Sequence, residues 1–240
     1  MAGALKVMPV PTDRKSGKGR KGAKGGAEAV PGAPAPFTHT VTAEEWPEGE
    51  SRVVAHLERE LPPGGIPAYL EARKTGARSF VLWADPERRS RLATLVTVSA
   101  GDGVSAYQVH GGQGEIIGTV LREKALSGTG MRTRWTVAQT GAPEAVGSKG
   151  RIFWWYLWWL LFPLWVAIAA GSLVSGGGDV PRGPRRVIWR AGGEVPLEYR
   201  SDDEVVVHAP WVDQRLAAAL AALVRSFDSW LGTPWDDKRQ

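Results

Sequence analysis

The feature that most constrains this chain is an apolar run in its middle. Residues 152–175 read IFWWYLWWLLFPLWVAIAAGSLVS, and no charged residue occurs between Arg151 and Asp179. About 20 helical residues cross the hydrocarbon core of a bilayer, whereas apolar stretches of about 10–14 residues are more typical of helices buried in a protein core. The sequence therefore predicts that residues 149–178 form a transmembrane or membrane-inserted helix.

Aromatic side chains crowd the first part of this run, as they do in the interfacial belt of membrane helices. Five of the twelve Trp of the chain lie within it. Pro163 removes a backbone donor and is expected to kink the helix. The residues assigned to the membrane segment are Ile152, Phe153, Trp154, Trp155, Tyr156, Trp158, Trp159, Pro163, Trp165 and Val174.

The positive charge of the chain is concentrated near its start. Residues 1–26 carry seven Lys or Arg against one Asp, so the remainder of a chain with net charge +5 is close to neutral. A basic segment next to an anionic lipid surface gains about 1 kcal/mol per Lys or Arg. The residues assigned to contact with an anionic surface are Lys15, Lys18, Arg20, Lys21, Lys24, Lys149 and Arg151. A merely solvated tail is the alternative, and nucleic acid is not expected because no aromatic residue is interleaved with the Lys.

The rest of the chain predicts an α+β fold. We expect residues 1–37 to be a disordered basic tail and 38–148 an α+β cytosolic domain. Residues 51–61 (SRVVAHLEREL) have helical spacing, and a second short helix is expected near Ala68–Arg73. Residues 179–240 are expected to hold strands and an apolar C-terminal helix near Trp211–Leu231.

Short segments bounded by Gly, Asp or Pro predict an antiparallel β-meander or a barrel-like sheet. They are Phe80–Trp83, Leu92–Val98, Val104–Val109, Ile116–Leu121, Thr133–Val137, Val187–Arg190, Val195–Tyr199 and Glu204–His208. Two geometries follow for the apolar run. It spans the bilayer once, with the later strands outside. Alternatively it enters and returns, or lies along the surface, with both halves on one side and the later strands completing the preceding sheet.

Catalytic and metal-binding patterns are not evident. The chain has no Cys, and its four His are scattered without a paired ligand spacing. His110 and His208 are the candidates for a catalytic cluster, but neither has a partner residue at a spacing typical of an active site. We therefore expect no enzyme activity, no cofactor and no metal.

Several segments resemble the tubby-like group, which includes LURP-one-related proteins and phospholipid scramblases. They are GEIIGTVLREKA, TRWTVAQTG, VIWRAGGEVPLEYR, EVVVHA and the final WVDQRLAAALAALVRSF, within residues 80–140 and 186–228. The resemblance implies a closed twelve-stranded barrel around a hydrophobic C-terminal helix, here Leu216–Val224, and association with phospholipid or a membrane surface. The long apolar run departs from that pattern.

These observations predict a non-enzymatic protein of a bacterial plasma membrane, with its N-terminus in the cytoplasm. The first hypothesis is a membrane-anchored, single-pass adaptor that docks a cytoplasmic partner or assembly, or joins a heteromeric membrane complex. The alternatives are a tubby-like phospholipid-binding protein and a membrane-bound enzyme acting on a lipid or envelope substrate. A continuous barrel built from strands on both sides of the apolar run would favour the phospholipid-binding alternative.

Overall fold

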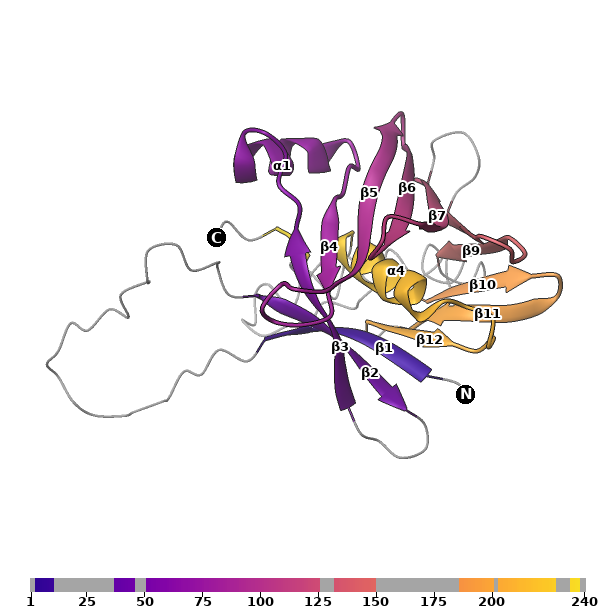
Figure 1. Cartoon of the computed structure of the whole chain (residues 1–240). Helices are drawn as coiled ribbons and strands as arrows, with labels where there is room; N and C mark the ends of the chain where they lie inside the picture. The colour runs from indigo at the N-terminus through magenta and orange to yellow at the C-terminus, as the bar shows by residue number, and fades with distance from the viewer. Residues whose placement is uncertain are drawn as a thin grey trace, which may run out of the picture.

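Twelve antiparallel strands close into a barrel around an apolar helix in the computed structural model of this protein (Figure 1). The structure describes residues 3–10, 37–45, 51–125, 132–149, 186–200, 203–227 and 234–237. Each strand pairs with its neighbours in the chain, and β1 pairs with β12 to close the barrel.

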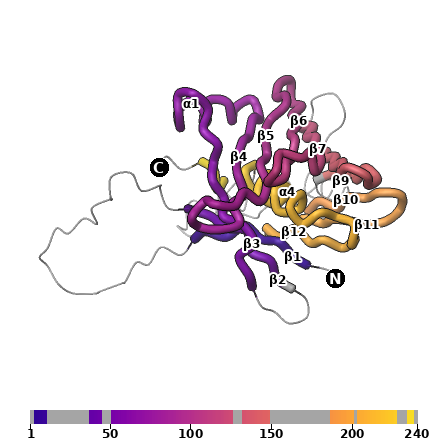
Figure 2. Tube along the Cα trace, in the orientation of Figure 1, coloured from indigo at the N-terminus to yellow at the C-terminus, as the bar shows by residue number. Residues whose placement is uncertain are grey.

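The strands are β1 (Gly3–Pro9), β2 (His39–Glu45), β3 (Ser51–Arg59), β4 (Phe80–Trp83), β5 (Arg91–Gly101), β6 (Val104–Gly111), β7 (Ile116–Glu123), β8 (Arg134–Gln139), β9 (Ala145–Lys149), β10 (Val187–Ala191), β11 (Glu194–Tyr199) and β12 (Glu204–Val207). Helix α1 (Gly65–Lys74) connects β3 to β4, and helix α4 (Gln214–Ser226) follows β12. Figure 2 traces this path and shows β1, in indigo, beside β12, in orange.

Helix α4 is apolar on nearly every face because the barrel surrounds it. Leu216, Leu220 and Leu223 are at most 1% exposed, and the Ala residues between them are equally enclosed. Alternating residues of the strands face the helix, since successive side chains of a strand point to opposite faces. Gly118 on β7 permits a close approach, because a Cβ there would lie 3.2 Å from Leu216. The Asp213 side chain accepts a hydrogen bond from the Arg215 N–H and caps the helix.

The expected α+β fold with a transmembrane helix is wrong. The described residues are mainly β-strand, and the 13 residues of α4 span only about 20 Å, against about 30 Å for a bilayer core. Within the ranges that the structure describes, no helix combines the length and the apolar character needed to cross a membrane. The membrane segment assigned from sequence, Ile152–Val174, lies outside these ranges.

The single-pass topology is also wrong, because strands on both sides of the apolar run belong to one barrel. β9 and β10 are antiparallel neighbours, with Lys149 opposite Val187. A single crossing between them would place two hydrogen-bonded strands on opposite sides of a bilayer. Residues 187–207 instead complete the sheet that the earlier strands begin, as the second geometry requires of the strands. The path of the apolar run itself lies outside the described residues.

Two local expectations are corrected as well. Residues 51–59 form strand β3 rather than a helix, because pairing with β2 and β4 buries Ala55 and Leu57 on the barrel's inner face. Within the expected disordered tail, Gly3–Pro9 forms β1, whose pairing with β12 closes the barrel. The expected strands between residues 80 and 137 and between 187 and 208 are present, as is the apolar C-terminal helix.

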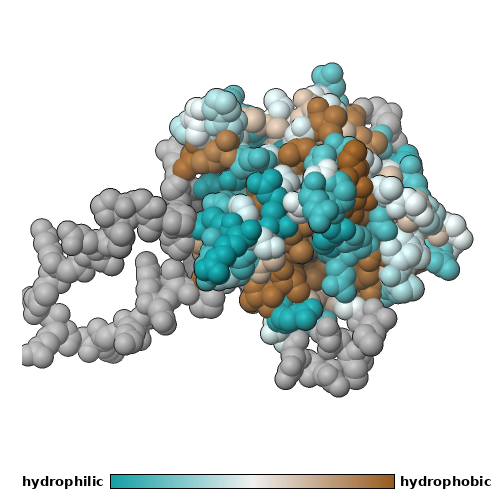
Figure 3. Space-filling model, in the orientation of Figure 1, coloured by the Kyte–Doolittle hydropathy of each residue, from teal (hydrophilic) through white to brown (hydrophobic). Residues whose placement is uncertain are grey.

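The outer surface mixes polar and apolar side chains. On the face shown in Figure 3, hydrophobic residues lie in small patches between hydrophilic ones. The most exposed of the large apolar residues are Val98, Ile116 and Val53, which lie on different strands. Single exposed apolar residues are normal on protein surfaces and indicate no particular function.

Candidate functional site

Every second connection between consecutive strands lies at the same end of the barrel. Because all neighbouring strands are antiparallel, the odd-numbered strands finish at one end, and the connections that follow them are all there. We call this end the insert end. Two of its connections are long, residues 10–38 between β1 and β2 and residues 150–186 between β9 and β10. They contain the basic run and the apolar run identified in the sequence.

The barrel holds the two ends of each long connection together. The Val10 N–H donates a hydrogen bond of 2.9 Å to the Thr38 carbonyl, next to the paired residues Pro9 and His39. Lys149 and Val187 are paired in the same way at the second connection. Lys149 is the last residue of β9, whereas the other residues assigned to lipid contact, Lys15–Lys24, Arg151 and Ile152–Val174, lie outside the described residues. Their roles stay predictions.

Helix α4 also ends at the insert end, where the C-terminal residues fold back onto it. Trp235 is 4% exposed, its Nε1–H donates a hydrogen bond of 2.8 Å to the Ala222 carbonyl, and its ring centroid lies 5.4 Å from that of Phe80. Asp236 is fully buried. Trp235 and Asp236 therefore belong to the packed interior and not to the surface.

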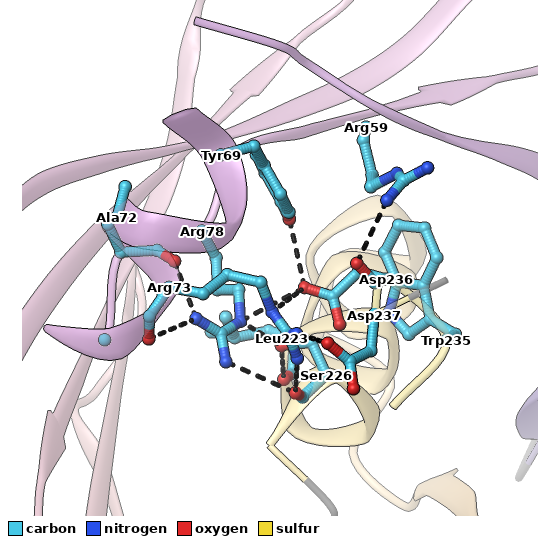
Figure 4. Close-up of polar contacts among 12 residues, drawn as sticks. Arg59, Tyr69, Ala72, Arg73, Arg78, Leu223, Ser226, Trp235, Asp236 and Asp237 are labelled. Carbon is cyan, nitrogen blue, oxygen red and sulfur yellow. Dashed lines mark hydrogen bonds and ion pairs between the residues drawn. The ribbon is translucent and has the colours of Figure 1, made fainter. Parts of the chain in front are cut away.

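Figure 4 shows the polar cluster around Asp236. One carboxylate oxygen, Oδ2, lies 3.0 Å from Arg73 Nε and 3.2 Å from Arg78 Nε, and it accepts a hydrogen bond of 3.0 Å from the Tyr69 hydroxyl. Its second oxygen, Oδ1, is buried without a hydrogen-bond partner. Burial raises the pKa of Asp236, while the charges of Arg78 and Arg73 lower it, and the net direction is upward.

The short helix α1 carries two residues of this cluster, Tyr69 and Arg73. Tyr69 and Arg73 are four residues apart and therefore share one face of the helix. The helix ends at a turn in which Gly76 has a φ of 103°, and a Cβ at that position would lie 2.5 Å from Ser105 Oγ. Glycine is required there both by the backbone conformation and by the close approach of β6.

Arg78 follows this turn and is almost completely bonded. Its backbone N–H donates to Thr97 Oγ1 at 2.7 Å. Its guanidinium donates to Ser226 Oγ through Nε and to the Ser226 carbonyl through Nη2, at 3.1 and 3.3 Å. Through Nη1 it donates to the carbonyls of Arg73, in the last turn of α1, and Ala77. The side chain is 5% exposed. Arg78 therefore ties α4 to α1 and contributes charge at the barrel mouth.

A second, partly buried arginine, Arg122, contacts the same aromatic ring as Arg78. The guanidinium carbons of both lie 4.1 Å from the centre of the Phe227 ring, and that of Arg122 lies 5.7 Å from the Trp135 ring. Burial lowers the pKa of Arg122, and the nearby charge of Arg78 lowers it further. Arg122 Nε is buried without a hydrogen-bond partner.

The aromatic contacts of Arg122 are too weak to offset the free-energy cost of removing its charge from water. A cation–π contact contributes about 0.5–2 kcal/mol. The effective cost of removing a charged group from water is several kcal/mol, and a compensating charge and hydrogen bonds are needed to offset it. The three arginines Arg73, Arg78 and Arg122 have two carboxylates among them, the fully buried one of Asp236 and the partly exposed one of Asp237, which pairs with Arg73. Arg122 is paired with neither, so the mouth of the barrel at the insert end carries one partly buried positive charge that no described carboxylate offsets.

The opposite end holds a different feature, a cavity of about 370 Å³ beside the start of α4. Its walls include the apolar residues Leu5, Val54, Leu92 and Ala218, together with Arg52 and Arg215. Arg215 is bonded to Asp213 and Glu115. Because this cavity is remote from the two long connections, it does not share their chemistry.

The His residues considered from sequence do not form a reactive cluster. His110 lies 3.3 Å from the Gly114 carbonyl of its own turn, and His208 lies 3.4 Å from Glu198 on the adjacent strand. In the part of the chain that the structure describes, no group of three or more acidic or His residues is arranged to hold a metal ion.

Comparison with known proteins adds no relative. No protein-family model, no curated protein and no solved structure matches this chain. A closed twelve-stranded barrel around an apolar helix is the architecture that the tubby-like resemblance implies. The agreement concerns architecture alone, so membership of that group stays a prediction.

Proposed function

We propose that this protein binds a phospholipid bilayer through its insert end, with the whole barrel on one side of the membrane. The observation that carries the proposal is the pairing of Lys149 with Val187 in adjacent strands. This pairing places both ends of the apolar connection at the barrel end that also bears the basic connection and the arginine cluster. No enzymatic step is part of the proposal.

The chemistry of the two connections supports this orientation. The apolar run has the composition of a segment that prefers acyl chains, with Trp and Tyr at one end as in an interfacial belt. The basic run adds attraction to anionic headgroups of about 1 kcal/mol per Lys or Arg. One apolar segment and one polybasic segment together provide two membrane-binding signals, which is what stable peripheral attachment generally takes.

The continuous barrel favours phospholipid binding over the adaptor hypothesis. An adaptor with separate domains on the two sides of a bilayer required the strands of residues 187–207 to fold apart from the others, and they pair with them instead. Docking of a protein partner stays a prediction for which no described contact provides support.

The test is flotation of the purified chain with lipid vesicles, either of phosphatidylcholine alone or with added phosphatidylglycerol. In one variant a short Gly-Asn linker replaces residues 150–186, which the pairing of Lys149 with Val187 should tolerate. In a second variant Gln replaces Lys15, Lys18, Arg20, Lys21 and Lys24. The matched control carries the same linker inserted in the β8–β9 turn, at the opposite end of the barrel.

We expect wild type and control to float with both kinds of vesicle, and more strongly with the anionic one. The linker variant should stay folded by circular dichroism and lose flotation on neutral vesicles. The Gln variant should lose only the anionic enhancement. Wild-type protein that remains at the bottom of the gradient with every vesicle, or a linker variant that floats like wild type, would contradict the proposal.

A further inference from the structure

Arg122 lies inside the barrel although it is charged. Gly118 and Val120 precede it at two-residue spacing on β7, and both are buried, so alternation places Arg122 on the inner face. Its strand partners Trp135 and Ser105 are buried inner-face residues as well. Arg122 is the next-to-last residue of β7, and it therefore lies just inside the mouth of the insert end.

The three arginines at this mouth differ in their partners. Arg73 and Arg78 share the carboxylate of Asp236, and Arg73 also pairs with Asp237. Each guanidinium nitrogen of Arg78 donates a hydrogen bond. Arg122 has the faces of Phe227 and Trp135, and no carboxylate pairs with it among the described residues. Its Nε is buried with no acceptor. Aromatic rings contact the flat face of a guanidinium and leave the N–H groups on its edge free for an acceptor.

We propose that Arg122 anchors a binding site for a phosphate group at the mouth of the barrel. The N–H groups of Arg122 donate to the phosphate oxygens, since the guanidinium fork matches phosphate geometry. The N–H groups of Arg78 already have acceptors. Arg78 therefore contributes only its positive charge, from its own contact with the Phe227 ring. Phe227 and Trp135 hold the Arg122 guanidinium in place before the ligand arrives. The ligand offsets the positive charge of Arg122, which no described carboxylate offsets.

The position at the insert end indicates the headgroup phosphate of a phospholipid as the source, and this identification rests on the proposed function. Free phosphate has the same chemistry, so the experiment separates the two sources. A phosphate dianion or phosphomonoester fits better than a single carboxylate, because two arginine charges, those of Arg78 and Arg122, adjoin one ring.

The first measurement is the Tm of the full chain in chloride buffer, with inorganic phosphate added to millimolar concentration at constant ionic strength. A ligand that binds only the folded state raises Tm. Wild type should gain several degrees, and calorimetry should show saturable phosphate binding. Arg122→Gln, and Arg122→Met, which retains an apolar stem over Phe227, should have Tm values in chloride equal to or above that of wild type, and should lose the phosphate shift.

Arg134→Gln is the matched control. Arg134 lies at the same mouth on β8, beside the strand partner of Arg122, but it is 47% exposed and paired with Glu123. This variant should retain the full phosphate shift. Absence of saturable phosphate binding to wild type, or a phosphate shift that survives in both Arg122 variants, would overturn the proposal.

Vesicle flotation then identifies the source. If the ligand is a lipid, phosphatidic acid in the vesicles should strengthen wild-type flotation beyond that seen with phosphatidylglycerol vesicles of equal charge. Free phosphate should reduce that gain, and Arg122→Gln should lack it. If wild type floats, and Arg122→Gln keeps both the phosphatidic acid gain and the phosphate shift in Tm, this site is refuted and the proposed membrane binding stands. A phosphate shift that depends on Arg122 in a protein that never floats would confirm a site for free phosphate and refute the proposed function.

Discussion

Replacement of Trp235 tests whether the C-terminal segment closes the insert end. The Trp235 ring packs against Phe80 and His39, with centroid distances of 5.4 and 5.9 Å, and its Nε1–H bonds the Ala222 carbonyl of α4. It is therefore the main contact by which residues after α4 join the barrel core. Trp235→Ala leaves a cavity among these residues and removes the hydrogen bond that the Ala222 carbonyl accepts from the indole.

The expected loss is large for one residue. Deletion of a buried Trp side chain costs roughly 3–5 kcal/mol in the free energy of unfolding. A chain of this size loses about 2–4 °C in Tm per kcal/mol, so the decrease should be about 6–20 °C. Trp235→Phe keeps an aromatic ring beside Phe80 and loses the hydrogen bond, and it should cost about 1 kcal/mol for that bond, plus a smaller packing loss.

Urea unfolding, followed by near-ultraviolet circular dichroism, measures these differences. Truncation after residue 233 should destabilise at least as much as Trp235→Ala, because it removes the Trp235 contacts and also the Asp236 carboxylate that pairs with Arg73 and Arg78. If Trp235→Ala and the truncation both unfold at the wild-type urea concentration, residues 234–237 do not contribute to the barrel, and the account of the arginine cluster around Asp236 fails with them.

Two further predictions concern the barrel itself. Gly118→Ala places a Cβ 2.6 Å from the Ala138 carbonyl and should cost about 1–3 kcal/mol in urea unfolding, whereas Gly101→Ala, with no atom within 4 Å, should change little. Burial raises the pKa of Glu198, but the hydrogen bond and charge of Arg186 outweigh it, so its folded pKa is below the ordinary 4.5. Its stabilising contribution is therefore present above pH 4.5 and is lost as pH falls through the folded pKa. Wild type should lose more stability than Glu198→Gln on acidification below pH 4.5, and equal losses would contradict this assignment.

The sequence was informative where a pattern is local. Short apolar segments between Gly and Asp turns predicted most of the strands from β4 onward, and the apolar stretch around Leu216–Val224 predicted the enclosed helix. The predictions from sequence were wrong where strand pairing in the tertiary structure overrides local preference. Residues 51–59 have helical spacing, yet hydrogen bonds to β2 and β4 make them a strand. Strand β1 is followed by a stretch rich in Gly, Lys, Ala and Pro, and only its pairing with β12 and β2 identifies it.

The candidate site could not be predicted in the same way. Arg73, Arg78, Arg122 and Asp236 are separated by up to 163 positions, and no local spacing links them. They meet because α1, β7 and the C-terminal residues converge on the end of α4. Charge and hydropathy are properties of single residues, so the sequence by itself determined that this chain carries a basic run and an apolar run. Strand pairing determines which end of the barrel carries these two runs. Only the tertiary structure shows that both connections start and end at the same mouth of the barrel as the arginine cluster.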